Sequence, residues 1–145
     1  MNIDTPAGFW IRLVALFVDG IIVSITIGLF TATIYGQFFL EEYTFLEVIG
    51  PIYYVLLPVL WYGYTLGKRA MGIRISRVDG GKVGVGTMLL REIVGNLIYG
   101  LTIGIAIIVS IFMVVFREDK RAIHDLIANT YVTYSEPEEL RYKEN

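Results

Sequence analysis

The sequence predicts an all-α polytopic membrane protein: two full transmembrane helices, a third helical or re-entrant membrane segment, and a small cytoplasmic β layer. Of its 145 residues, 55% are hydrophobic and 18% are charged, whereas soluble domains average about 45–50% apolar and about 25% charged residues. The apolar residues are gathered in three blocks, and an alternating apolar/polar stretch lies between the second and the third. This length fits one domain, residues 1–145.

Composition also excludes several classes of protein. The chain has no cysteine, which removes disulfide scaffolds and thiolate metal sites. Its acidic isoelectric point, near 5.4, argues against a nucleic-acid partner. No serine-nucleophile motif or phosphate-binding Gly-rich loop is present, so we expect neither an enzyme nor a bound cofactor.

The first membrane segment is expected over about residues 9–36. Leu13–Tyr35 contains one ionisable residue, Asp19, and would form about 34 Å of helix, enough for a hydrocarbon core of about 30 Å. The apolar stretch is too long for a signal peptide, an acid interrupts it, and no small-residue cleavage site follows. We therefore expect a retained helix.

The second and third segments are expected at about 45–64 and 87–116. Glu47 is the one ionisable residue of the second, and Ile93–Phe116 carries no charge. One such block could be a buried core helix, but three leave too little polar chain to cover them. The third block either crosses once or turns near Gly100 and returns as a re-entrant hairpin, which is tolerated where protein covers its backbone.

The distribution of basic residues predicts the orientation. No Lys or Arg occurs from Leu13 through Leu66, and Glu41 and Glu42 lie between the first two blocks. Residues 67–92 then contain six basic residues, which the positive-inside rule places in the cytoplasm. The N-terminus would be cytoplasmic as well, and a returning third segment would put the C-terminus there too.

A small β layer is expected on the cytoplasmic side. Gly72–Val78 alternates apolar and polar residues, and the following Asp-Gly-Gly favours a tight turn. A hairpin over 72–86 would result, with 82–85 as its returning strand and 130–134 as a third strand. The alternative is an irregular basic loop. The polar tail, 135–145, is expected to be loosely ordered.

Two ionisable residues of the first segment are the main candidates for a site. Asp19 lies ten residues after Phe9, about 15 Å along the helix and near the bilayer midplane, where a charge is costly and commonly functional. Such a carboxyl would carry a proton or bind a cation. Arg12, two turns earlier, lies on the same face. The alternatives are that Asp19 is protonated and serves packing only, and that Arg12 only sets topology.

Two further positions are weaker candidates. Glu47 is expected near the outer end of the second helix, where water would reach it. His124 belongs to the dense charged stretch Arg117–Leu126 and is the chain's one histidine, so a metal site is not expected.

The combined motifs resemble the RDD family of small bacterial membrane proteins. The resemblance rests on AGFWIRL with the later Asp19-Gly20, on TLGKRAMGIRI from Thr65, on Arg91 in LLRE, and on KRAIHDLIANTYV from Lys120. It implies a site triad of Arg12, Asp19 and Asp125. The supporting candidates are Lys68, Arg69, His124 and Glu47.

This resemblance implies transport, because cation/proton antiport is associated with some members of the family. We therefore expect a multi-pass protein of the bacterial inner membrane, embedded in the lipid bilayer, that exchanges Na⁺ or K⁺ for H⁺ as a homo-oligomer. Asp19 would bind the ion, and Arg12 could bridge to Asp125. The alternative is a non-transporting membrane adaptor, or a lipid- or partner-binding protein, with a basic cytoplasmic face. A lipid-modifying enzyme is the third choice.

Overall fold

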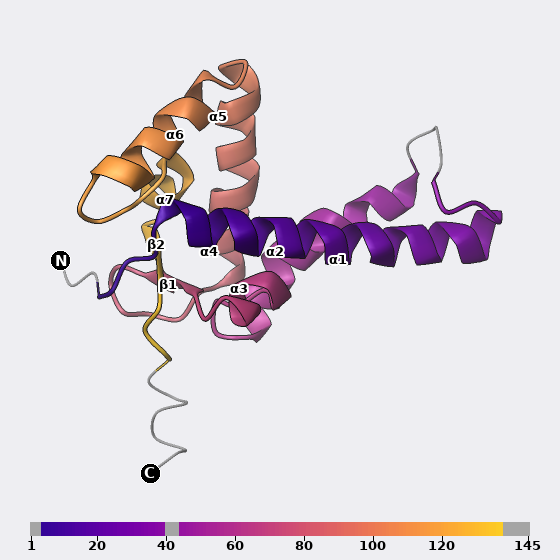
Figure 1. Cartoon of the computed structure of the whole chain (residues 1–145), viewed down its shortest axis with the longest axis horizontal. Coiled ribbons are helices and arrows are strands. Elements are labelled where there is room, and N and C mark those ends of the chain that lie inside the picture. The colour runs from indigo at the N-terminus through magenta and orange to yellow at the C-terminus, as the bar shows by residue number, and fades with distance from the viewer. Residues whose placement is uncertain (1–3, 40–43, 138–145) are drawn as a thin grey trace, which may run out of the picture.

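The structure, a computed structural model, describes residues 4–39 and 44–137. Two helical arms leave a small body that contains the sheet (Figure 1). The first arm consists of α1 (Phe9–Tyr35), η1 (Phe45–Val48) and α2 (Ile49–Leu60). The second consists of α4 (Val85–Leu89), the π-helical turn η2 (Leu90–Val94), α5 (Gly95–Leu101) and α6 (Ile105–Phe116). Glu41, Glu42 and the tail from 138 onward lie outside the described residues.

Helix α1 follows the first predicted segment closely. It begins after the extended Gly8 and ends at Gly36, whose left-handed φ of 72° lets its N–H bond the carbonyl of Ala32. Its 27 residues span about 40 Å. Among the described residues it is the one helix long and apolar enough to cross a membrane; the helices over 45–60 and 105–116 are apolar but shorter.

The second segment ends earlier than predicted. Helix α2 stops at Leu60, two residues after Pro58, instead of continuing to residue 64. Proline removes a helical hydrogen bond, and Tyr62 and Gly63 then adopt left-handed backbone conformations with φ of 52° and 92°. The chain turns here and begins α3 (Leu66–Ala70).

The third segment folds as a helical hairpin. The helix that starts at Val85 ends at Leu101, Ile103 and Gly104 take left-handed backbone conformations, and α6 returns toward the body (Figure 1). The chain thus turns back between Leu101 and Ile105, close to the predicted turn near Gly100. After α6 come α7 (Ile123–Ile127) and the last strand.

The sheet has two antiparallel strands, β1 (Arg74–Arg77) and β2 (Thr130–Thr133). Their pairing confirms the predicted contact between the middle of the chain and its C-terminal part. The N-terminal segment adds to the far edge of β2, because Pro6 forms a bridge with Thr133 and the N–H of Ala7 donates to the carbonyl of Val132 over 2.8 Å.

The returning strand predicted at 82–85 is absent, so the expected hairpin and three-strand layer were wrong in that part. Residues 82–84 form no regular structure and Val85 begins α4. The edge of β1 where that strand would pair is occupied by Gly63, whose carbonyl accepts the N–H of Ile75 over 2.8 Å. A Cβ on Gly63 would meet the carbonyl of Ile75, so glycine makes this approach feasible.

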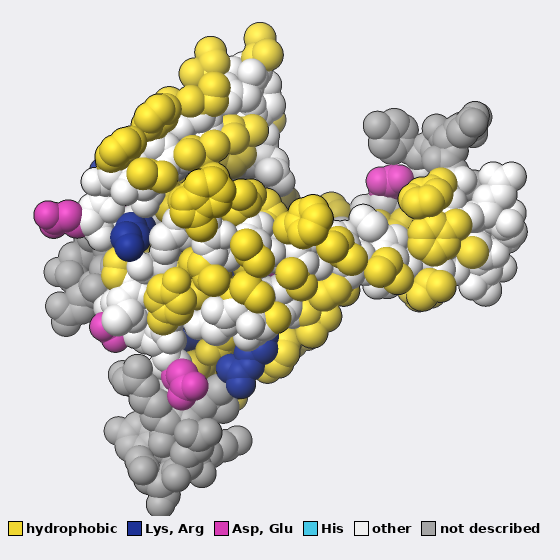
Figure 2. All heavy atoms as spheres, viewed as in Figure 1, with side chains coloured by type: hydrophobic (Ala, Val, Ile, Leu, Met, Phe, Trp, Pro, Cys, Tyr) yellow, Lys and Arg dark blue, Asp and Glu magenta, His cyan; other side chains and the backbone are white. Residues whose placement is uncertain are grey.

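The packed core lies where the first arm meets the sheet. It consists of Ala7, Ala15, Val55, Ile73, Ile75, Val83, Met88 and Val132. Helix α3 is held against α1 at Gly67, where a Cβ would meet the carbonyl oxygen of Ala15 and the backbone and side chain of Asp19. On the face shown in Figure 2, hydrophobic side chains cover both arms, and most charged side chains gather around the body.

Gly67→Ala is expected to destabilise the fold by about 1–3 kcal/mol, the usual cost of forcing a methyl group into packed structure. Gly86→Ala is the matched control, because no atom lies within 4 Å of a Cβ at that helical position. Thermal unfolding of the two variants in detergent measures the difference. Equal melting temperatures would contradict the close approach of α3 to α1.

Candidate functional site

The carboxylate of Asp125, on α7, lies between two arginines. The guanidinium of Arg12 donates from Nη1 to Oδ2 over 2.7 Å, and Nη1 of Arg91 donates to Oδ1. The N–H of Ala122 donates to Oδ2 over 3.0 Å. Asp125 is fully buried, so both of its oxygens are satisfied by the protein alone. The contact between Arg12 and Asp125 raised by the sequence analysis is therefore present.

Further hydrogen bonds hold the guanidinium groups of Arg12 and Arg91 in place. Arg12, in the first turns of α1, also donates to the carbonyls of Ala7 over 3.0 Å and Lys120 over 2.5 Å. Arg91 lies in the π-helical turn, a feature frequent at functional sites, and also donates to the hydroxyl of Thr130 over 3.0 Å. Burial alone would raise the pKa of Asp125, but the charges of Arg91 and Arg12 outweigh it and hold that pKa well below its usual range.

His124 extends this cluster into the second arm. Arg91 Nη2 lies 3.0 Å from His124 Nε2, and because a guanidinium only donates, Nε2 accepts and the ring proton is on Nδ1. Nδ1 then donates to the hydroxyl of Tyr99 over 2.5 Å, and Tyr99 donates to Ser110 over 3.0 Å. Burial and the charge of Arg91 lower the pKa of His124 to about 3, so the imidazole is neutral at physiological pH.

Asp19 is the centre of a second cluster, between α1 and the start of α3. Its carboxylate accepts hydrogen bonds from the hydroxyls of Tyr53 (2.6 Å) and Thr65 (2.5 Å) and from the N–H of Gly67 (2.7 Å). Each hydroxyl itself accepts a backbone N–H, from Leu66 and Lys68 respectively, which leaves its proton for Asp19. Asp19 is fully buried, and its carboxyl oxygens are satisfied by donors from the chain itself.

The environment of Asp19 in the structure differs from the one expected from the sequence. The sequence analysis puts Asp19 alone near the middle of an apolar span. In the structure it lies level with Thr65 and Gly67, at the start of α3. An isolated charge in an apolar helix is costly, and these hydrogen bonds from the chain itself offset that cost.

Lys68 completes the second cluster. Its ammonium Nζ lies 3.9 Å from Asp19 Oδ2, and within residues 4–39 and 44–137 no hydrogen bond holds it. Burial, together with the nearby charge of Arg91, lowers the pKa of Lys68 to about 8 even though Asp19 opposes the shift. Lys68 therefore exchanges its proton far more readily than an ordinary lysine.

A cavity of about 520 Å³ lies between the two clusters. Arg12, Lys68, Arg91 and His124 reach its polar end, and α1 and α6 contribute apolar walls. Neither Asp19 nor Asp125 lines it. The wall thus carries cationic side chains, with the two buried carboxylates behind them.

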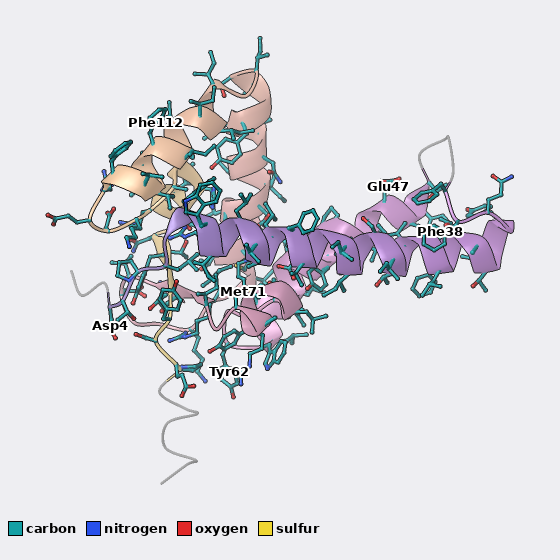
Figure 3. The ribbon with its side chains drawn as sticks, viewed as in Figure 1. Asp4, Phe38, Glu47, Tyr62, Met71 and Phe112 are labelled. Carbon is teal, nitrogen blue, oxygen red and sulfur yellow. The ribbon has the colours of Figure 1, made fainter. Side chains whose placement is uncertain are left out.

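Two supporting candidates lie elsewhere. Arg69 is exposed and its guanidinium stacks 4.8 Å above the ring of Tyr64. Glu47 is exposed at the end of the first arm farthest from the sheet, near Phe38 (Figure 3). The structure therefore brings Arg12, Lys68, Asp19, His124 and Asp125 around the cavity, but not Arg69 or Glu47.

Sequence reasoning left Arg91 out of the site, although it contacts Asp125, His124 and Thr130. A signal was present: Arg91 and Glu92 are the only charged residues between Gly84 and Phe116. Thr65 begins one of the motifs that carry the family resemblance, but the hydroxyls of Tyr53 and Tyr99 had no comparable signal, because nothing local distinguishes them from other tyrosines of the chain.

Comparison with known proteins identifies the family of the chain. The sequence profile of the RDD family matches residues 6–129. The chain belongs to the RDD family. Three of the motif residues by which the resemblance was recognised, Arg12, Asp19 and Asp125, belong to the two clusters described above.

Relatives of the chain occur in Bacillus subtilis (strain 168). The uncharacterized protein YckC is 48% identical over 96% of this chain and 91% of its own length. The uncharacterized protein YxaI is 30% identical over 90% of this chain and 99% of its own length. A third, named uncharacterized membrane protein YteJ, is 28% identical over 88% of this chain and 80% of its own length. No solved structure matches the chain as a similar protein.

The pair Arg12–Asp125 is expected to show strong energetic coupling. Removing Asp125 leaves Arg12 and Arg91 without their shared carboxylate, whereas removing Arg12 leaves Asp125 with Arg91 as its one charged partner among the two arginines; breaking a buried pair typically costs about 3–5 kcal/mol, so we expect the larger loss for Asp125→Ala. In a double-mutant cycle of Arg12→Ala and Asp125→Ala, measured by denaturant unfolding in detergent, the double variant should lose about 0.5–3 kcal/mol less than the sum of the single losses. Additive losses would contradict the direct pairing.

Proposed function

We propose that the chain is a small membrane transporter that exchanges a monovalent cation, Na⁺ or K⁺, for a proton. The observation that carries this proposal is the buried Asp19–Lys68 pair, with a separation of 3.9 Å and with Lys68 at the wall of a cavity. A lysine held loosely beside a buried carboxylate is a group that a cation can replace once the lysine has lost its proton.

The sheet and the arms support a placement in a membrane. Strand β2 is hydrogen-bonded to β1 on one edge and to residues 5–7 on the other, and we therefore propose that all three lie on one side of the bilayer. In this arrangement α1 leaves that side of the bilayer and α2 returns to it, between residues 5–7 and β1. The α5–α6 hairpin enters the bilayer and returns to the same side between β1 and β2. The basic residues of 67–92 favour the cytoplasm for that side. This supports a multi-pass arrangement with both ends cytoplasmic.

The exchange step conserves charge. When the Lys68 ammonium releases its proton to water in the cavity, a cation takes the vacated position beside Asp19 Oδ2. The hydroxyl of Thr65, bonded to the same Oδ2, would supply a second oxygen beside that position, and oxygen ligands suit alkali cations. The net charge of the cluster is the same before and after. Three membrane segments are few to enclose such a path, so we propose a homo-oligomer.

Flux measurements test the exchange pair. In proteoliposomes with an imposed pH gradient, Asp19→Asn and Lys68→Arg should each reduce Na⁺ or K⁺ exchange at least tenfold, because the first removes the carboxylate and the second introduces a cation that stays protonated. Glu118→Gln and Lys82→Arg are the matched controls outside the cavity and should retain wild-type flux. Wild-type flux in Asp19→Asn or Lys68→Arg would refute the proposal.

The proposal also predicts a pH dependence. Lys68 has its pKa lowered to about 8, so its ammonium is mostly protonated at pH 7 and mostly neutral at pH 9. Cation loading requires the neutral lysine and should therefore rise as pH increases through about 8. Binding of ²²Na⁺ to the purified protein at fixed ionic strength measures this; loading that is flat between pH 7 and pH 9 would contradict the role of Lys68.

A second candidate function is a non-transporting membrane adaptor with a basic cytoplasmic face. The observation in its favour is that three protein donors already satisfy the Asp19 carboxylate, as expected if Asp19 only fastens α3 to α1. The adaptor predicts that Asp19→Asn lowers the melting temperature and that neither wild type nor variant moves cations. The transporter predicts loss of flux in a variant that remains folded.

A further inference from the structure

The cavity is also a groove that opens to the apolar surface of the molecule. Its walls include Leu13 and Leu16 on α1 and Ile107 and Ile111 on α6. These four side chains are between 37% and 55% exposed, so they line the cavity and at the same time belong to the apolar surface of the two arms. A bound apolar group could therefore enter sideways from surrounding lipid.

The polar end of the groove carries an excess of cations on its wall: Arg12, Lys68 and Arg91, against Glu92. Arg12 and Arg91 are engaged by Asp125 and by other oxygens of the chain. Lys68 differs from the two arginines, because no atom of the described residues accepts a hydrogen bond from its ammonium group. One acidic group at this end would satisfy it.

We propose that this groove binds one anionic phospholipid from the surrounding bilayer, with an acyl chain between α1 and α6 and the acidic headgroup at Lys68. This site shares Lys68 and the cavity with the proposed exchange of cations, but it does not require that the protein transports anything. It assigns a ligand to the side of the second arm where Ile107 and Ile111 are partly exposed at the groove.

The chemistry of the groove favours a lipid over other occupants. A small water-soluble anion would satisfy Lys68 but leave the apolar walls of α1 and α6 uncovered. A peptide would bring backbone N–H and C=O groups against those walls without partners, which is costly. A phospholipid supplies an acid and a hydrocarbon chain in one molecule, and a volume of about 520 Å³ is within the usual range of about 300–1,000 Å³ for ligand pockets.

Native mass spectrometry of the purified full chain tests the proposal. After delipidation, the protein is titrated with phosphatidylglycerol or with phosphatidylcholine of the same acyl chains. Wild type should retain one phosphatidylglycerol with about fivefold preference over phosphatidylcholine, the ratio for one basic side chain worth about 1 kcal/mol at an anionic surface. Lys68→Gln should bring that preference to about one.

Filling the groove should remove the lipid whatever its headgroup. Ile111→Trp and Leu16→Trp, from opposite walls, should each reduce retention at least fivefold, whereas Ile108→Trp, on the same helix but outside the cavity, should retain the lipid. Unchanged retention in both wall variants overturns the proposal, as does equal affinity of wild type for the two lipids. Thermal stabilisation by free glycerol phosphate equal to that by phosphatidylglycerol would also overturn it, since the site would then bind soluble anions.

Discussion

The carboxylate of Asp125, held between Arg12 and Arg91, is the interaction on which the rest of the structure depends. The three residues come from the start of the first arm, the base of the second arm and the short helix before β2. Removing Asp125 would leave two arginines without their shared counter-charge. Both arms and the sheet are therefore positioned by a single group of charged side chains, and its two arginines reach the polar end of the cavity.

The two buried carboxylates differ in the kind of partner that satisfies them. Asp125 is bound by guanidinium groups, which keep their protons at any physiological pH. Asp19 is bound by neutral donors and by one ammonium at longer range, and that ammonium can lose its proton. This contrast explains why the proposed exchange uses Asp19 and Lys68, while Asp125 serves to hold the arms together.

Much of this arrangement could be predicted, and the exceptions have physical causes. The first helix and the hairpin of the third segment follow from the positions of apolar runs and glycines. The returning strand at 82–85 was wrong because Gly63 occupies the edge of β1, a contact between residues 12 positions apart that no local pattern reveals. Arg91 was missed as a site residue for a similar reason: its partners lie more than 30 positions later in the chain.

By itself, the sequence determined the family, the apolar blocks and the identity of Arg12, Asp19 and Asp125 as charges that need an explanation. These properties depend on composition, periodicity and motif order, which are local or are read directly from the chain. The tertiary structure decided which charge meets which: Asp19 with Thr65 and Lys68, and Asp125 with two arginines. Burial makes these pairings obligatory, because a charge removed from water requires a partner, but only the folded backbone determines which partner comes within reach.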